Sequence, residues 1–191
     1  KYIIIDHKLR PESTSEAKKV QQLLKKKLIK SQILSWKGKK PTSNIQSLAR
    51  KKRYELLCTS SKNLKSNNIL LGHHEDDLIE NFFIRLIRGS GLRGLVSLSG
   101  KKSNGNINLL RPLINEKKDT LTYISNKVFN FYVKDPSNEN EKFLRVGVRK
   151  LLNELNKFGL GKDKMINAIN NLKTSNDVVN FYVNENLKNN T

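Results

Sequence analysis

Acidic and imidazole side chains are concentrated in residues 72–81, which read Gly-His-His-Glu-Asp-Asp-Leu-Ile-Glu-Asn. If a helix starts here, Asp77 and Glu80 are three residues apart and Asp76 and Glu80 are four apart, so each pair brings two carboxylates together. Like charges at these spacings cost a helix roughly 0.2–0.5 kcal/mol per pair, which the N-terminal helix dipole offsets in part. A cation held between the carboxylates would offset the rest. We therefore predict a site for a positively charged group here.

Two other interpretations of residues 72–81 stay open at this stage. The acids can form an ordinary first helical turn whose charges are solvated. Histidines and acids can also bind zinc, but no further Cys or His lies at ligand spacing. The two histidines, His73 and His74, precede the acids at a predicted strand end and favour a functional site over a solvated turn.

Basic side chains occur at helical spacing in two further segments. Arg50, Arg53 and Tyr54 lie on neighbouring turns of one predicted helix, for which a solvated basic face is the alternative. Arg145 and Arg149 lie four residues apart on another predicted helix, where two arginines can straddle a phosphate.

Glycines follow the acidic segment, in residues 85–94. The helix that carries the acids is predicted to end at Gly89, because glycine readily adopts the left-handed backbone. Three glycines close together allow a tight backbone path beside Arg88. Such a pattern does not by itself identify a phosphate site.

The elements that position these residues alternate between strands and helices. Short apolar runs predict strands, and apolar residues at helical spacing predict helices. Strands are expected at 2–5, 32–36 and 69–71, and helices at 11–30, 44–60 and 74–88. This alternation is typical of an α/β fold with a doubly wound, mostly parallel sheet and flanking helices. Ligands bind beyond the carboxyl ends of the strands in that architecture, and Asp6, His7 and Gly72 lie there.

Some side chains carry specific burial and capping expectations. The continuous apolar run Tyr2–Ile5 suits a strand that is buried on both faces. Ser13 or Ser15 is expected to cap the first helix, and Leu28 to belong to its apolar stripe. On the helix at 74–88, one apolar face is expected to run from Leu78 through Ile87.

The pattern weakens after Gly94. Residues 99–108 are expected to form a loop of Gly, Ser, Asn and Lys, and Asp135–Asn138 a turn. Further helices are expected at 116–128, 142–155 and 162–187, the last of them long and polar. We predict a catalytic domain over residues 1–157 and a helical extension over 158–191 that leads towards a second domain.

Charge is the most informative bulk property. The 191 residues include 37 Lys and Arg against 17 Asp and Glu, a formal net charge of +20, which favours a polyanionic partner. Compositional bias of the source genome is the alternative, to which the many asparagines point. The single cysteine, Cys58, forms no disulfide within the chain and favours a reducing, cytoplasmic location. Neither a membrane-spanning apolar run nor a signal peptide is visible.

Taken together, these segments resemble the lysidine synthases of the PP-loop ATP pyrophosphatase superfamily. Residues 5–10 are similar to the family's Val-Asp-His-Gly-Leu-Arg, and residues 72–81 to its Gly-His-His-x-Asp-Asp-Gln-Ala-Glu-Thr. Residues 85–94, 111–113 and 135–138 continue the likeness in the family's order. The chain departs from the family at Leu78, Ile79 and Asn81, and at the pair Val146-Gly147.

A further departure concerns the phosphate loop. The family's Ser-Gly-Gly-x-Asp-Ser segment does not occur in the sequence, which begins Lys-Tyr-Ile-Ile-Ile inside a predicted strand. We therefore expect an N-terminally truncated piece that lacks its first strand and phosphate loop and is inactive by itself.

The resemblance implies an ATP-dependent ligase that joins free L-lysine to C2 of the wobble cytidine in the CAU anticodon of tRNA(Ile). ATP would adenylate the C2 oxygen and release pyrophosphate, and the ε-amine of lysine would then attack C2 and displace AMP. Mg²⁺ would neutralise the triphosphate. The sequence does not fix the oligomeric state, and a homodimer is compatible with it.

The same resemblance assigns roles to the polar residues. Asp77 and Glu80 would hold and deprotonate the lysine amine, and Arg53 would act with them as a third catalytic residue. The residues assigned to substrate and tRNA are His73, His74, Asp76, Arg50, Arg88, Arg145 and Arg149. The residues assigned to the nucleotide are Asp6, His7 and Gly72. No residue is assigned to a metal.

Two competing functions are weighed against this one. A tRNA thiolase of the same superfamily typically needs paired cysteines, and only Cys58 is present. A non-catalytic basic RNA-binding module accounts for the net charge but not for acids grouped at the carboxyl end of a strand.

Overall fold

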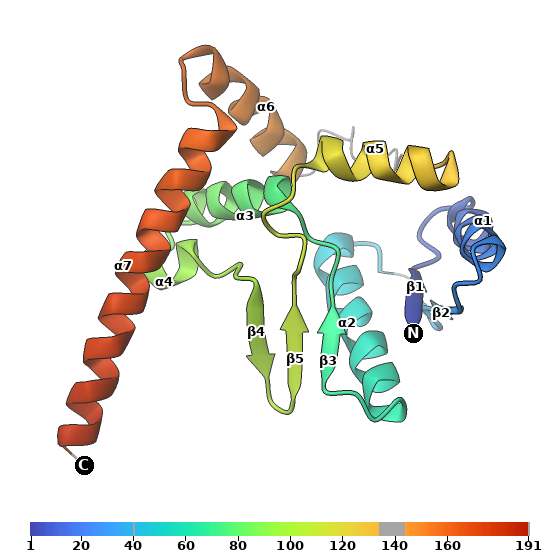
Figure 1. Ribbon diagram of the computed structural model, residues 1–191, viewed down its shortest axis with the longest axis horizontal. Helices are drawn as coiled ribbons and strands as arrows, with labels where there is room; N and C mark the ends of the chain where they lie inside the picture. The colour runs from blue at the N-terminus through green and yellow to red at the C-terminus, as the bar shows by residue number, and fades with distance from the viewer. Residues whose placement is uncertain (40, 134–143, 191) are drawn as a thin grey trace. The chain divides into compact units, whose positions relative to one another are not determined.

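The computed structural model of the chain describes residues 1–39, 41–133 and 144–190 (Figure 1). They form two compact units. Unit 1 consists of residues 1–70, 102–110 and 125–133, and unit 2 of residues 71–101, 111–124 and the described part of 134–191. The predicted turn at Asp135–Asn138 lies outside the described residues.

Unit 1 begins with a strand, a helix and a second strand. Strand β1 (Tyr2–Asp6) pairs in parallel with β2 (Ser31–Ser35), and helix α1 (Ser13–Lys26) connects them. The register runs from Tyr2 opposite Ser31 to Asp6 opposite Ser35, so both strands end at the same edge. The predicted burial of β1 on both faces is wrong, because Tyr2 is exposed and the isoleucines are half-buried.

Helix α1 ends earlier than its apolar stripe predicts. The backbone N–H groups of Leu28 and Ile29 donate to the carbonyl oxygens of Lys25 and Leu24, both at 2.9 Å, which closes the last turn. Leu28 takes a left-handed backbone with φ +59° and is 93% exposed, so its predicted place on the apolar stripe is wrong. The predicted serine cap is also absent, because Glu12 occupies the N-cap position and the Ser13 hydroxyl donates elsewhere.

Unit 1 also contains helix α2 (Ile45–Asn63) and a second ladder of strands in the order β3 (Asn68–Leu70), β5 (Ile107–Leu110) and β4 (Lys101–Asn104). Strands β3 and β5 are parallel, and β4 and β5 form a hairpin (Figure 1). The loop predicted for residues 99–108 is therefore wrong. Gly105, at φ +58°, supports the tight hairpin turn, and the polar sequence of the outer strand β4 concealed it.

Unit 2 is helical. It contains α3 (Glu75–Ile87), the short α4 (Leu92–Leu95), the start of α5 (Lys118–Phe129), α6 (Leu144–Lys157) and α7 (Lys162–Asn189). The predicted α/β fold with parallel pairing and C-terminal helices is confirmed. Within the described ranges, no helix combines the length and the hydropathy that crossing a membrane requires.

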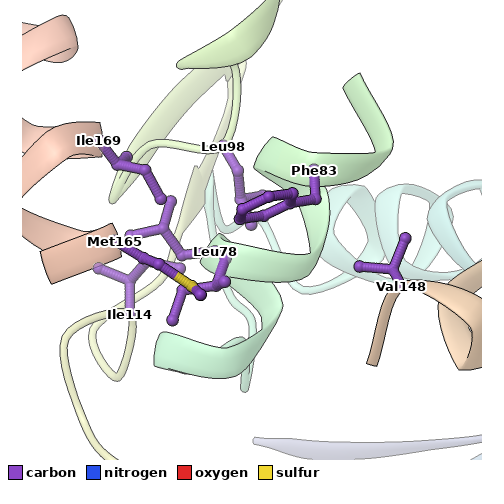
Figure 2. Close-up of a cluster of buried hydrophobic side chains, with 8 residues drawn as sticks. Leu78, Phe83, Leu98, Ile114, Val148, Met165 and Ile169 are labelled. Carbon is purple, nitrogen blue, oxygen red and sulfur yellow. The ribbon is translucent and has the colours of Figure 1, made fainter. Parts of the chain in front are cut away.

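Packing around α3 holds unit 2 together (Figure 2). Met165 of α7 lies beside Ile114 and Leu78 in Figure 2, and the cluster as a whole is Leu78, Ile79, Phe83, Leu98, Ile114, Val148, Met165 and Ile169. Each such side chain contributes roughly 1.5–3 kcal/mol when it is fully buried. The predicted apolar face of α3 is correct from Leu78 to Phe83 and wrong for Leu86 and Ile87, which are exposed.

Candidate functional site

The N-terminus of α3 presents the acidic cluster in unit 2. His74, which follows β3 with an extended backbone, is the N-cap, and its backbone N–H donates to Asp77 Oδ2 at 3.1 Å. Three acids in the first turn suit the positive end of the helix dipole. Asp77 therefore fixes the start of the helix through its Oδ2.

Two arginines of α6 face the acids of α3. Arg149 Nε donates to Glu80 Oε1 at 2.5 Å, and Arg145 Nη1 lies 3.7 Å from Asp77 Oδ1 and 3.9 Å from Glu80 Oε2. Glu80 is only 4% exposed, and its Oε2 accepts no hydrogen bond. The structure thus brings together four predicted site residues. In this arrangement the arginines neutralise carboxylates instead of standing free for a phosphate.

Asp76 points to a different partner. Its Oδ1 lies 2.6 Å from Nζ of Lys162, the first residue of α7. Lys162 was not predictable from the sequence, because 86 residues separate it from Asp76 and nothing in the local pattern relates them. This ion pair joins the N-terminal turns of two helices.

A cleft of about 570 Å³ lies beside these residues, within unit 2. It is lined by side chains of α3, α6, the first turn of α5 and the first turn of α7, among them Glu75, Asp76, Glu80 and Arg149. Its size falls in the range of small-molecule sites. Glu75, which was also not predicted as a site residue, lines the cleft and is 7% exposed.

The other predicted residues of unit 2 are placed differently. Gly72 borders open space, since a Cβ built there would meet nothing within 4 Å, and His73 is half-buried. Arg88 is exposed at the C-terminal end of α3. The helix has 13 residues, so roughly 20 Å separate Arg88 from the acidic end.

The glycines of residues 85–94 have structural roles. Gly89 takes φ +68°, its N–H donates to Leu86 O at 2.9 Å, and the N–H of Ser90 donates to Arg85 O at 3.0 Å. This is the Schellman motif, so the predicted helix end at Gly89 is confirmed. Gly94 allows close approach, because a Cβ there would lie 2.9 Å from Ser90 Cβ. These glycines terminate and pack helices.

Asp6 is the buried acid of unit 1, at 2% exposure. Its carboxylate accepts hydrogen bonds from Thr14 Oγ1 at 2.7 Å and from the Lys8 N–H and Ser13 Oγ at 2.9 Å each. Burial alone would raise the pKa of Asp6, but these hydrogen bonds outweigh it and hold the pKa below its ordinary value of 3.8. Asp6 thus joins the end of β1 to the start of α1.

His7 and Arg53 meet in unit 1, at the carboxyl ends of β1 and β2. Arg53 Nε donates to His7 Nε2 at 3.3 Å, although 46 residues separate the two. The indole of Trp36, directly after β2, meets the His7 ring edge-on with 6.3 Å between centroids. The contact made by Trp36 was not predicted, and the place of Trp36 at a strand end was the only signal for it in the sequence.

Arg50 lies one turn before Tyr54 on the same helix. Its guanidinium stacks 5.2 Å from the ring centre of Tyr54 and donates to the Tyr54 hydroxyl at 3.3 Å. The predicted basic face of α2 is thus exposed and partly ordered by an aromatic ring.

The sequence of the chain is similar to that of known proteins. The profile of the PP-loop domain family matches residues 1–155. The tRNA(Ile)-lysidine synthase of Orientia tsutsugamushi (strain Boryong) is 42% identical over 154 residues, which are 80% of this chain and 34% of that protein. The tRNA(Ile)-lysidine synthase of Rhodopseudomonas palustris (strain ATCC BAA-98 / CGA009) is 35% identical over 153 residues, which are 80% of this chain and 44% of that protein. The chain spans less than half the length of these curated relatives.

A solved structure shares the fold. The U34-tRNA thiolase NcsA from Methanococcus maripaludis aligns with a TM-score of 0.72 at 18% sequence identity, and the alignment covers 89% of this chain and 61% of that one. At this identity the likeness concerns the fold alone. The match over residues 1–155 shows that the chain belongs to the PP-loop domain family.

Proposed function

We propose that the chain is the PP-loop part of a tRNA(Ile)-lysidine synthase, which uses ATP to join L-lysine to C2 of the wobble cytidine in the CAU anticodon. The observation that carries the proposal is the buried carboxylate of Glu80. It has one oxygen without a hydrogen bond and lies beside Asp77 at the start of a helix. The relatives that match at 42% and 35% identity carry this name, which supports the same assignment.

The chemistry of lysine explains why acids are needed. The ε-amine has an ordinary pKa near 10.4, so it arrives as an ammonium and must lose a proton before it attacks C2. Asp77 and Glu80 would bind the ammonium by charge and then accept that proton. The pairing of Glu80 with Arg149 limits the cost of keeping a carboxylate buried until the substrate arrives.

The nucleotide would lie at the carboxyl ends of β1 and β2. Arg53 and His7 supply a guanidinium and an imidazole there, both of which suit phosphate or a base, and Trp36 fixes the imidazole ring. ATP would supply the adenylyl group that activates the C2 oxygen. Mg²⁺ would enter on its phosphates, as it usually does in nucleotide-dependent enzymes.

The polyanionic substrate would be tRNA. A net charge of +20 supports this, because phosphate contacts from Lys and Arg supply most of the affinity for nucleic acid. Arg50 and Arg88 are both exposed, which suits a role in such contacts.

The two alternative functions, a tRNA thiolase and a non-catalytic RNA-binding module, explain fewer of these features. A thiolase with paired cysteines would need more than Cys58, the single cysteine of this chain. An RNA-binding module without catalysis does not explain the buried carboxylate of Glu80, because burying a charge costs free energy and does not help to bind RNA. The test is lysidine formation by the full-length protein, followed through lysine-dependent release of AMP and pyrophosphate from ATP with tRNA(Ile) as substrate. Turnover that is independent of lysine would overturn the proposal.

A further inference from the structure

Glu75 is a buried acid without a protein partner. Its backbone N–H donates to Glu116 O at 3.1 Å, but no donor among the described residues contacts its carboxylate. The side chain is mostly buried, but its carboxylate oxygens are not fully enclosed, so they stay accessible from the cleft. Because Glu75 lines the cleft of unit 2, a cation that enters the cleft would satisfy it.

Glu80 supplies a second unsatisfied oxygen to the same cleft. Its Oε2 accepts no hydrogen bond, and Arg145 Nη1 lies 3.9 Å from it. Five residues separate Glu75 from Glu80, a rise of roughly 7.5 Å along α3. Both acids line the same cleft, so they can meet the two ammonium groups of one ligand.

Positive groups also line the cleft. Lys117 and Lys118 stand at the start of α5, where the helix dipole favours an anion. Lys117 lies 3.8 Å from Asp163, whereas Lys118 has no ion pair among the described residues. In a chain of net charge +20, a cleft that combines buried acids with lysines suits a zwitterion better than a polyanion.

We propose that this cleft binds the main-chain end of free lysine, with Glu75 receiving the α-ammonium and Lys118, at the N-terminus of α5, receiving the α-carboxylate. The ε-ammonium would then lie at Glu80 and Asp77. This inference rests on the proposed function and adds to it a residue, Glu75, that selects the substrate without taking part in bond formation.

The test compares Glu75→Gln with Glu154→Gln in the full-length enzyme. Glu154 is an exposed acid of α6 that pairs with Lys157 and does not line the cleft, so it is a charge-matched control. Three amines are used as substrates: lysine, 6-aminohexanoate, which lacks the α-amine, and 1,5-diaminopentane, which lacks the carboxylate. Turnover and KM are measured for each.

Glu75→Gln should raise the KM for lysine about tenfold or more, the loss expected for one charged hydrogen bond, and leave kcat within about twofold. Its KM for 6-aminohexanoate should stay at the wild-type value. Lys118→Gln should raise the KM for lysine and leave that for 1,5-diaminopentane unchanged, and Glu154→Gln should change none of the three values. The ratio of KM values within one variant does not depend on how much of that variant is folded.

Two outcomes overturn the inference alone. In the first, wild-type enzyme uses lysine but does not prefer it to 6-aminohexanoate. In the second, Glu75→Gln leaves the ratio of these two KM values unchanged. A wild-type enzyme that shows no lysine-dependent turnover would instead overturn the proposed function itself.

Discussion

At the scale of single residues, the acids of α3 have different partners. Asp77 caps the helix, Glu80 is buried against Arg149, and Asp76 pairs with Lys162. It was predictable from spacing that these acids are neighbours on one helix, because residues three and four apart lie on the same face. Their partners were not, since Arg149 and Lys162 lie 69 and 86 residues away and only the packing of α6 and α7 brings them there.

Substitution of the two proposed catalytic acids tests their assigned role. Asp77→Asn keeps an oxygen that can accept the His74 N–H, and Glu80→Gln keeps the shape of the side chain. Both variants should therefore stay folded yet lose lysidine formation by about 10²-fold or more. Product formation and circular dichroism should be measured together. Wild-type turnover in both variants, with an unchanged spectrum, would remove the assigned role.

The hydrogen bonds of Asp6 predict how the free energy of unfolding changes at low pH. Its pKa is below 3.8 in the folded chain, so the stability that it contributes is complete above that pH and is lost as the pH falls through the lower folded value. Asp6→Asn should lower the free energy of unfolding by about 1–3 kcal/mol at pH 7. Urea unfolding at pH 7 and pH 3 should show the difference between the two proteins shrinking at the lower pH. A difference that is the same at both values would contradict this account.

At the scale of elements, apolar runs located β1, β2 and β3 to within one residue. Apolar spacing located α2, α3, α5, α6 and α7 to within a few residues. It failed where the backbone decided the outcome, as at Leu28, whose left-handed conformation ends α1 against its apolar pattern. It also failed for the hairpin of β4 and β5, because an outer strand can be polar and a two-residue turn needs little more than Gly105.

Gly94 offers a test of packing between α4 and the turn that precedes it. Gly94→Ala would bring a methyl group to 2.9 Å from Ser90 Cβ and should destabilise the chain by about 1–3 kcal/mol. Gly91→Ala is the control, since Gly91 has no neighbour within 4 Å and an ordinary φ of −70°. Chemical denaturation of both variants should separate them. Equal stability would show that the turn relaxes without cost.

At the scale of the whole molecule, the +20 charge predicts how tRNA binding responds to salt. Affinity should fall steeply as salt rises, because each phosphate contact releases counterions. Arg88→Ala should flatten the slope of log K against log salt by about one unit. Arg149→Ala should flatten it less, because Arg149 already pairs with Glu80. Filter binding or fluorescence anisotropy over a range of salt concentrations would check this, and a constant affinity would contradict it.

The uneven burial of α7 has a consequence for its dynamics. Met165 and Ile169 anchor the first turns of this 28-residue helix in the core of unit 2, whereas Val179 and Tyr182 in its second half are exposed. That half is rich in asparagine, a poor helix former, so local propensity adds little there. Amide hydrogens should therefore exchange with deuterium slowly near Ile169 and progressively faster towards Asn189. The local stability of α7 should therefore decrease from its packed N-terminal turns towards its exposed second half.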